Sequence, residues 1–144
     1  MQVSDAMTRD VRVANAEETI EQAARLMAGL DVGMLPVGKD NRLIGMITDR
    51  DIAVRAVAQG KGPGTKVRDV MTDDVKYCFA DQQIAEVTVN MGDIQVRRLP
   101  VLDRDKQLVG ILSLGDVAAA ARDGAAGEAL AGISRPGGAH SQTG

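Results

Sequence analysis

The stretch Leu43–Ala53, LIGMITDRDIA, decides how the rest of the sequence can be interpreted. Its apolar first half predicts a buried strand. The Thr48-x-x-Asp51 pattern that follows is typical of a helix start, where a hydroxyl and a carboxylate cap free backbone N–H groups. The same pattern returns as LVGILSLGDVA at Leu108–Ala118, with serine in place of threonine. The chain therefore contains one strand-to-helix step twice.

The repeat extends well beyond this step. VSDAMTRDV, which starts at Val3, aligns with VRDVMTDDV, which starts at Val67, at an offset of 64 positions. The same offset aligns Leu35–Val37 with Leu99–Val101, both LPV, and one extra residue in the second copy then raises it to 65. An ordered match of this length predicts two copies of one structural unit.

Both copies predict the same order of elements. Alternating valines at Val11 and Val13 indicate a short strand, and a capping box opens a helix over Thr19–Leu30. The apolar runs Met34–Val37 and Leu43–Thr48 flank a turn-forming Gly-Lys-Asp-Asn sequence, so we expect an antiparallel hairpin.

A second helix is expected from Asp49 to about Gln59, with Gly60 ending it. In the second copy, the first helix is less clearly marked, because Gln83 is a poor cap and the AEVTVNM sequence carries several β-branched residues. We nevertheless predict a helix there from its counterpart in the first copy.

The predicted fold is α/β of the α+β kind, with two repeats packed about a pseudo-twofold axis, each strand-helix-strand-strand-helix. Three strands are too few for one copy to be stable alone, and pairing the copies hides the apolar face of each sheet. The predicted domains are residues 1–60 for the first repeat, 61–66 for a linker and 67–123 for the second repeat. Residues 124–144 are predicted to be a flexible tail, because they hold few large apolar side chains.

Composition and charge exclude several classes of function. A formal net charge of −3, with one Tyr and one Phe, argues against nucleic-acid binding. No apolar run of about 18 residues occurs and the N-terminus lacks a signal-peptide pattern, so we expect a cytoplasmic protein without membrane contact. The single cysteine, Cys78, is expected in a buried strand, and the single histidine is His140. Neither a disulfide nor a metal site is therefore expected.

The repeated step has two interpretations. It can be a capping box and nothing more. It can also bind a ligand, because the hydroxyls of Thr48 and Ser113, together with free N–H groups at a helix start, suit a phosphate. The carboxylates of Asp51 and Asp116 can each accept two hydrogen bonds from a ribose diol. Phosphate at one end and ribose at the other would describe a nucleotide.

Two further features favour the nucleotide interpretation. Gly45 and Gly110 lie inside apolar strands, where glycine often marks the close approach of another backbone or of a ligand. Arg97 and Arg98 stand directly before the second LPV motif, and their forked guanidinium donors match phosphate oxygens. Adjacent arginines can also simply place alternate side chains in solvent.

The twice-repeated pattern of VxDxMT and LPV, with GMITDRD in one copy and GILSLGD in the other, closely resembles the CBS domain. A tandem pair of such domains is called a Bateman module. The resemblance covers roughly Val3 to Arg122 and is nearest to stand-alone bacterial CBS-pair proteins. It implies a non-enzymatic sensor that binds AMP, ADP or ATP, and in some members NAD or S-adenosylmethionine, and that commonly forms a homodimer. No catalytic cofactor is implied.

The resemblance also implies roles for individual residues. Thr48 and Ser113 would contact phosphate, and Asp51 and Asp116 would hold the ribose. The segments implied to line the adenine through backbone contacts contain Val13, Ala14, Ala16, Tyr77, Cys78 and Ala80. The segments implied to form the opposite wall contain Gly33, Met34, Leu35, Pro36, Arg97, Arg98 and Pro100.

The two copies differ inside the step. Arg50 gives the first copy an additional phosphate donor, where the second copy has Leu114 and Gly115. If the pseudo-twofold axis brings Arg97 and Arg98 across to the first cleft, that cleft holds most of the positive charge. On this basis we expect the first cleft to bind more tightly than the second.

Two other functions are compatible with the sequence. The first is a structural or protein-interaction module in which the steps are only helix caps and no nucleotide binds. The second is a nucleotide hydrolase, which needs a base or a metal cluster beside the phosphate. Asp49, Asp51 and Asp116 are too few and too separated in sequence to argue for such a cluster.

Overall fold

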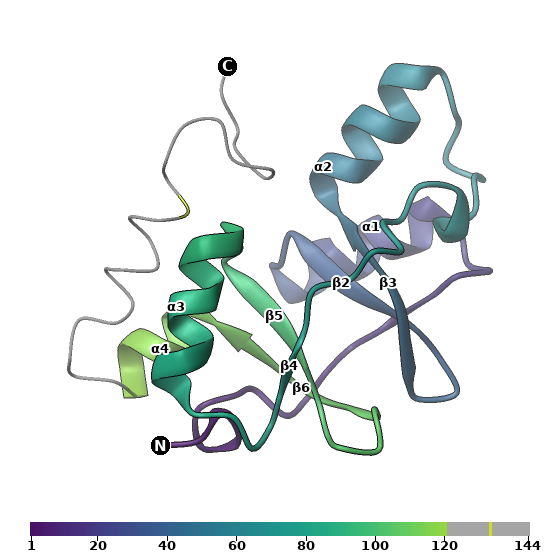
Figure 1. The fold of residues 1–144 in the computed structure, drawn as a ribbon. Coiled ribbons are helices and arrows are strands. Elements are labelled where there is room, and N and C mark those ends of the chain that lie inside the picture. Colours follow the sequence, from purple (N-terminus) through teal and green to yellow (C-terminus); the bar gives the residue numbers. More distant parts are fainter. Residues whose placement is uncertain (121–132, 134–144) are drawn as a thin grey trace. The chain divides into compact units, whose positions relative to one another are not determined.

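The computed structural model describes residues 1–120 and Ile133, and this part of the chain forms an α+β protein with two three-stranded sheets (Figure 1). The predicted fold class is therefore confirmed. The strands are β1 (Ala14–Asn15), β2 (Met34–Lys39), β3 (Arg42–Thr48), β4 (Cys78–Phe79), β5 (Arg98–Leu102) and β6 (Leu108–Ser113). The α-helices are α1 (Ile20–Leu30), α2 (Asp49–Asp51), α3 (Ile84–Ile94) and α4 (Leu114–Ala120). Shorter helical segments are η1 (Val3–Asp5), η2 (Ile52–Ala56), η3 (Val57–Gln59) and η4 (Val67–Asp69).

The first sheet has the strand order β1-β2-β3. Strand β1 runs parallel to β2, with α1 as the connection, and β2 pairs with β3 in the antiparallel sense with Met34 opposite Thr48. The hairpin turns at Asp40 and Asn41, which both adopt left-handed backbone angles, with φ of 53° and 63°. These angles match a type I′ turn, which suits the twist of a hairpin. The predicted hairpin is confirmed.

Helix α1 begins where its capping box predicts. The Gln22 N–H donates to Thr19 Oγ1 over 3.2 Å, and the Thr19 N–H donates to Gln22 Oε1 over 2.9 Å. The helix buries Ile20 and Met27 against the first sheet, and the residue that caps its C-terminal end, Asp31, has a left-handed φ of 55°.

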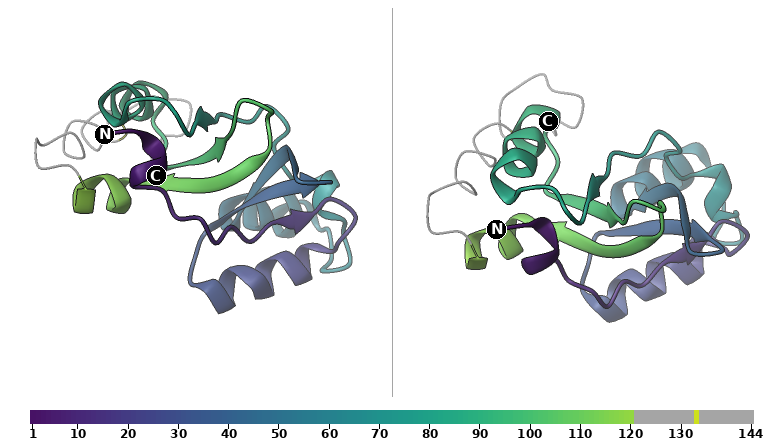
Figure 2. Two further views of the ribbon diagram at one scale, coloured as in Figure 1. Left: turned by 90° about the horizontal axis from the view of Figure 1, so that it is seen from below. Right: turned by 60° about the horizontal axis from the view of Figure 1, so that its bottom comes forward.

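The second sheet repeats this plan with the order β4-β5-β6. Figure 2 shows α3 and α4 lying against it. Helix α3 forms without a side-chain cap at Gln83, which confirms the helix predicted from the first copy. Its stability comes from the face that buries Val87 and Met91, because packing outweighs intrinsic propensity. The buried Thr88 hydroxyl is satisfied by the Ile84 carbonyl at 2.6 Å.

The helical segment after β3 reaches as far as predicted, but it is irregular. The single α-helical turn α2 passes into the π-helical segment η2 and then into the 3-10 turn η3. Gly60 ends the segment with a left-handed φ of 77°. The expected helix of Asp49–Gln59 is therefore correct in extent, whereas the hydrogen-bond register inside it is not regular.

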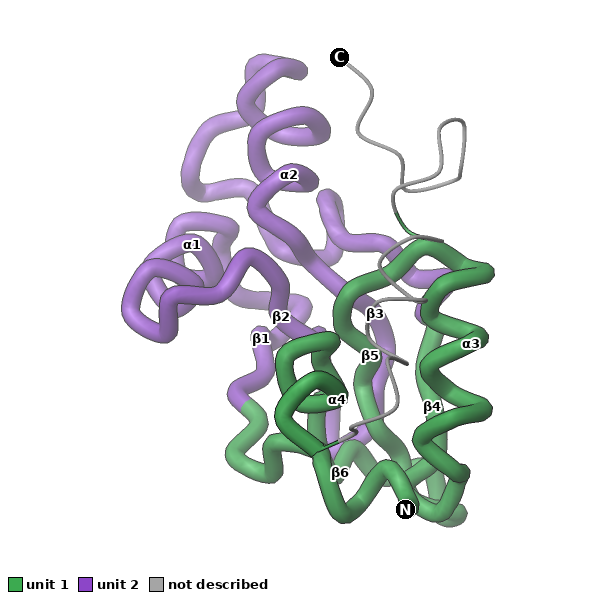
Figure 3. Tube along the Cα trace, turned by 90° about the vertical axis from the view of Figure 1, so that its left-hand side faces the viewer, with its two compact units in different colours: residues 1–11, 76–144 green, residues 12–75 purple. Residues whose placement is uncertain are grey.

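The two compact units of the chain do not coincide with the two sequence repeats. One unit contains residues 12–75, and the other contains residues 1–11 together with residues 76–144 (Figure 3). The start of each repeat thus packs in the core of the other repeat's sheet. Val3 and Met7 lie in one apolar core with Leu99, and Val67 lies in the other core. The packing of the two units about a pseudo-twofold axis stays a prediction.

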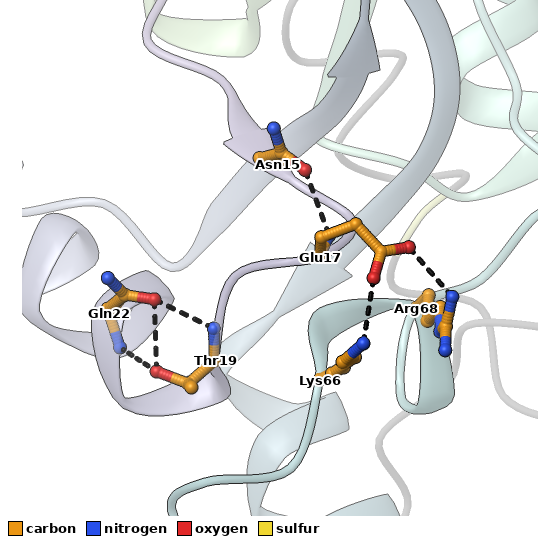
Figure 4. Close-up of polar contacts among 6 residues, drawn as sticks. All are labelled: Asn15, Glu17, Thr19, Gln22, Lys66 and Arg68. Carbon is orange, nitrogen blue, oxygen red and sulfur yellow. Dashed lines mark hydrogen bonds and ion pairs between the residues drawn. The ribbon is translucent and has the colours of Figure 1, made fainter.

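Surface ion pairs and backbone hydrogen bonds join the start of the second repeat to the unit of the first sheet. Glu17 accepts from Lys66 Nζ at 2.9 Å and from Arg68 at 2.7 Å (Figure 4). The hydrogen bond from Lys66 lowers the pKa of the Glu17 carboxyl. All three side chains are about half exposed, so each pair contributes little to stability. Backbone hydrogen bonds from Val67 to Glu18 and from Arg68 to Ala16 hold the same contact.

The first strand lies later than predicted. Val11 and Val13 are outside β1, and Val13 is 45% exposed, whereas Ala14 is fully buried. The alternation of valines was misleading, because the residue that pairs with Val37 of β2 in the core is Ala14 and not one of the valines. Cys78, which aligns with Ala14, is buried as predicted, and burial raises the pKa of its thiol to about 12. The predicted tail lies outside the described residues except for Ile133.

Candidate nucleotide-binding steps

The first strand-to-helix step is a complete capping box. The Asp51 N–H donates to Thr48 Oγ1 over 2.9 Å, and the Thr48 N–H donates to Asp51 Oδ2 over 3.0 Å. Both side chains are partly buried at the end of β3. The structure therefore brings the hydroxyl and the carboxylate together at one point, as the sequence predicts.

The other N–H groups of the first step also have partners. The Asp49 N–H donates to the Gly33 carbonyl over 2.9 Å, and the Arg50 N–H donates to Asp49 Oδ1 over 2.8 Å. With the bond from Asp51 to Thr48, the N–H groups of all three α2 residues are occupied within the chain. A phosphate at this step would have to displace one of these bonds.

The second step has the same capping box, but the residues around it differ. The Asp116 N–H donates to Ser113 Oγ over 3.1 Å, and the Ser113 N–H donates to Asp116 Oδ2 over 3.1 Å. The Leu114 N–H donates to the Arg97 carbonyl over 3.0 Å, as the Asp49 N–H donates to Gly33 in the first step. No carboxylate occupies the position of Asp49 here, since that residue is Leu114.

Backbone packing explains both strand glycines. A Cβ on Gly45 would lie 2.6 Å from Met71 Sδ and 3.0 Å from the Thr72 carbonyl oxygen. A Cβ on Gly110 would meet Met7 Sδ at 2.6 Å and the Thr8 carbonyl oxygen at 2.9 Å. Of the two explanations open from the sequence, the close approach of another backbone accounts for the glycines. They are therefore no evidence for a ligand.

This approach also explains the VxDxMT motif. Thr72 exchanges two backbone hydrogen bonds of 2.8 Å with Met46, and Thr8 exchanges two of 2.9 Å with Ile111. Each Met-Thr pair therefore forms a short bridge beside the strand that leads into the other repeat's step.

Thr8 and Thr72 were not among the residues predicted to form the site, and their hydroxyls have different partners. Thr8 Oγ1 lies 3.5 Å from both carboxylate oxygens of Asp116. Thr72 Oγ1 instead accepts from Arg55, at 3.3 Å. The repetition of VxDxMT was the available signal, because a motif kept in both copies indicates a shared position.

The residues implied to line the adenine separate into buried and exposed positions. Ala14 and Cys78 are buried in the two cores, so their side chains face away from any ligand and only their backbone can contribute. Val13 and Tyr77, which precede them, are 45% and 39% exposed. The Tyr77 ring contacts the Phe79 ring edge-on at 5.5 Å. The partly buried residues of the same predicted set are Ala16 and Ala80.

The residues implied to form the opposite wall lie at the start of each hairpin. Leu35, Pro36 and Pro100 are buried, whereas Gly33 and Met34 are partly buried. Each of these segments meets the helix that follows the hairpin through the Gly33 and Arg97 carbonyl contacts already described.

The three predicted phosphate-binding arginines are Arg50, Arg97 and Arg98, and all are exposed. Within the described residues, no ion pair or side-chain hydrogen bond is recorded for their guanidinium groups. Arg98 pairs with Ser113 across the hairpin, so the backbone of the arginine pair lies beside the second step. The structure does not test whether these side chains reach the first step.

The described part of the chain offers neither a metal-binding cluster nor a membrane-spanning helix. There, no three His, Cys, Asp or Glu side chains gather in a way that could hold a metal ion. None of the described helices has the length and apolar character needed to cross a membrane.

Sequence comparison identifies the repeats. The CBS domain family model matches residues 3–57 and residues 67–123. The CBS domain-containing protein YhcV of Bacillus subtilis is 40% identical over 133 residues, which are 92% of this chain and 94% of that protein. Hypoxic response protein 1 of Mycobacterium tuberculosis is 39% identical over 116 residues, or 79% of this chain and 80% of its own length.

Solved structures share the fold. Hypoxic Response Protein I with two coordinated zinc ions has a TM-score of 0.75 and 36% identity, over 83% of this chain and 98% of its own. CBSX2 in complex with AMP has a TM-score of 0.74 and 28% identity, over 83% of this chain and 95% of its own. The CBS domain pair of MJ0100 with 5′-methylthioadenosine and S-adenosyl-L-methionine has a TM-score of 0.74 and 26% identity, over 83% of this chain and 94% of its own. The resemblance inferred from the sequence motifs is thus confirmed, and the chain belongs to the CBS domain family as a tandem pair of CBS domains.

Proposed function

We propose that this protein is a non-enzymatic regulatory module that binds an adenine nucleotide at its strand-to-helix steps. The observation that carries the proposal is the repeated pairing of a hydroxyl with a carboxylate at the end of a strand. Thr48 is held to Asp51, and Ser113 to Asp116, by the same two hydrogen bonds. Phosphate chemistry for the hydroxyl and ribose chemistry for the carboxylate fit one nucleotide.

The carboxylates keep acceptor capacity after capping. Among the described residues, the recorded hydrogen bond to the Asp51 carboxylate ends on Oδ2, which leaves Oδ1 for a ribose hydroxyl. Asp116 likewise accepts from Ser113 at Oδ2, and its contacts with Thr8 at 3.5 Å are long enough to be replaced by a ligand. An ionised carboxylate can accept about four hydrogen bonds, so capping and ligand binding are compatible.

Related proteins that have been solved with a bound ligand support an adenine-containing ligand. CBSX2 has been solved with AMP, and MJ0100 with 5′-methylthioadenosine and S-adenosyl-L-methionine. All three ligands carry adenosine, whereas their substituents at the ribose 5′ position differ in charge. We therefore assign adenosine as the common recognition element. AMP, ADP, ATP, NAD and S-adenosylmethionine remain the candidate ligands.

The mode of signalling is part of the same proposal. The module would act through the geometry of a homodimer or of a protein partner, because a ligand changes a conformational balance only by binding one state more tightly. The homodimer, the cytoplasmic location and the tighter first cleft remain predictions.

A specific observation favours a second function. Each Thr/Ser-x-x-Asp is a complete helix cap, and each strand glycine is explained by a Met-Thr backbone, so the steps have a structural role without any ligand. A structural or protein-interaction module with no nucleotide is therefore the second candidate.

Calorimetric titration of AMP into the full chain and its variants separates the two candidates. Asp51→Asn and Asp116→Asn keep an oxygen that can accept the capping bond but remove the charge that would hold the ribose. If the proposal is right, each substitution lowers the affinity of its own step by roughly 1–3 kcal/mol, the cost of leaving polar groups badly paired. Asp105→Asn, in the β5–β6 turn, is the control and should leave binding unchanged.

The double variant Asp51→Asn with Asp116→Asn decides between the functions. Loss of AMP binding with an unchanged melting temperature supports the nucleotide module. Wild-type protein that shows no heat of binding with AMP, adenosine or S-adenosylmethionine at millimolar concentration would instead favour the module without a ligand.

A further inference from the structure

Asp49 places a carboxylate at the first step that the second step lacks. Its Oδ1 accepts from the Arg50 N–H at 2.8 Å. Its Oδ2 lies 3.0 Å from the position that a Cβ on Gly33 would take, so the carboxylate rests over the start of the first hairpin. Asp49 directly follows Thr48 and is exposed, so a phosphate bound at the Thr48 hydroxyl, as proposed, would come close to this carboxylate.

The charges around the two steps differ in sign. The first step carries Asp49, Asp51 and Arg50, and its hairpin begins with uncharged Gly33 and Met34. Like charges a few ångströms apart repel each other, and solvent weakens this repulsion at an exposed position without removing it. The additional carboxylate would therefore weaken the binding of a ligand with a phosphate and leave the binding of an uncharged ligand unchanged.

In the second step, Leu114 takes the place of Asp49. The Leu114 N–H donates a hydrogen bond to the Arg97 carbonyl, and Arg98 lies opposite Ser113 in the hairpin. The second step thus has one carboxylate, that of Asp116, and its hairpin begins with two arginines in place of Gly33 and Met34. An approaching phosphate meets no repelling side chain at the position equivalent to Asp49.

We propose that Asp49 is a specificity-determining residue: it makes the first step prefer adenosine ligands without a phosphate, while phosphate-bearing ligands prefer the second step. This inference rests on the proposed function, because it concerns which adenosine ligand each step selects. It also makes the predicted ranking of the two clefts depend on the charge of the ligand.

AMP and adenosine are the probes that test the inference, since they differ only by the phosphate. The Asp116→Asn variant of the full chain disables the second step, so that calorimetric titration reports the first. In that background, adding Asp49→Asn should raise the affinity for AMP about tenfold, and the affinity for adenosine should change less than twofold. Asparagine keeps an oxygen for the Arg50 N–H, so the change isolates the charge.

The reciprocal variant is the matched control. In the Asp51→Asn background, which disables the first step, Leu114→Asp introduces the carboxylate at the equivalent position. It should lower the affinity for AMP about tenfold and leave that for adenosine unchanged. Raising the salt concentration to 1 M should shrink both effects on AMP, because an exposed charge is then screened within about 3 Å.

The outcomes separate this inference from the proposed function. An AMP-to-adenosine affinity ratio that Asp49→Asn leaves unchanged, while adenosine still binds the Asp116→Asn protein, would overturn the role of Asp49 alone. Equal gains for AMP and adenosine would also overturn it, because the effect would then not come from the phosphate. Absence of binding for both probes in the wild-type protein would overturn the proposed function, and the role of Asp49 with it.

Discussion

At the scale of single residues, glycine at position 45 is required by the Met-Thr bridge. Gly45→Ala would place a Cβ 3.0 Å from the Thr72 carbonyl oxygen, which belongs to backbone and cannot easily move. Overpacking of this kind costs about 1–3 kcal/mol, so we expect urea denaturation to show a loss of that size. Gly29→Ala is the control, because a Cβ there meets nothing within 4 Å and alanine has a higher helix propensity than glycine in the last turn of α1. A Gly45→Ala protein as stable as wild type would mean that the bridge can shift.

The sequence predicted which residues would form each step, but it did not give the reason for every one. The Thr48-x-x-Asp51 pair was predictable, because a capping box is a local motif with a fixed spacing. The meaning of Gly45 was not, since the Met71–Thr72 segment that approaches it lies far away in the sequence. The role proposed for Asp49 was equally hidden, because it rests on the position of its carboxylate over Gly33.

At the scale of elements, α3 is the helix that the sequence marks least clearly, and its stability can be increased by a better N-cap. Gln83 is the N-cap without a side-chain cap, and Glu86 stands at the third helical position. Gln83→Ser would create the capping box that α1 already has, with an expected gain of about 0.5–1 kcal/mol. Gln83→Ala is the control, and thermal denaturation is the measurement. If the serine and alanine variants melt at the same temperature, the cap does not form.

The elements that the sequence predicted correctly are those whose start and end depend on residues close by in the chain. Helix α1 and the Asp40–Asn41 hairpin were predictable because caps and turns act over a few residues. Strand β1 was misplaced because its position depends on pairing with β2, where Ala14 faces Val37. The π-helical segment η2 within the helix after β3 could not be foreseen either, since no glycine or proline marks it.

At the scale of the whole molecule, each repeat contributes its first residues to the core of the other repeat's unit. Val3→Ala removes the two methyl groups of a fully buried side chain from the core of the second sheet. We therefore expect a loss of about 1.5–3 kcal/mol and faster hydrogen exchange first in α3 and β5, which are remote in sequence. Val67→Ala should have the matching effect on α1 and β2. Faster exchange of α1 in the Val3→Ala protein, with α3 unchanged, would contradict the exchanged packing.

The sequence repeat predicted two similar units but not this exchange. Alignment of the copies shows which residues are equivalent, and it does not show whether VxDxMT packs within its own repeat or in the other one. Both arrangements would leave the same pattern of apolar residues. The three-dimensional contacts of Met7 and Met71 were needed to distinguish them.

Thermal unfolding of the full chain with AMP, adenosine, NAD, S-adenosylmethionine and GTP tests the central claim most directly. A ligand that binds only the folded state, at a hundred times its dissociation constant, adds about 2.7 kcal/mol to the free energy of unfolding. We predict a higher melting temperature with one or more adenine ligands, none with GTP, and no shift in the Asp51→Asn, Asp116→Asn double variant. An unchanged melting temperature with every adenine ligand, or an equal rise with GTP, would contradict the assignment of the two steps to adenosine.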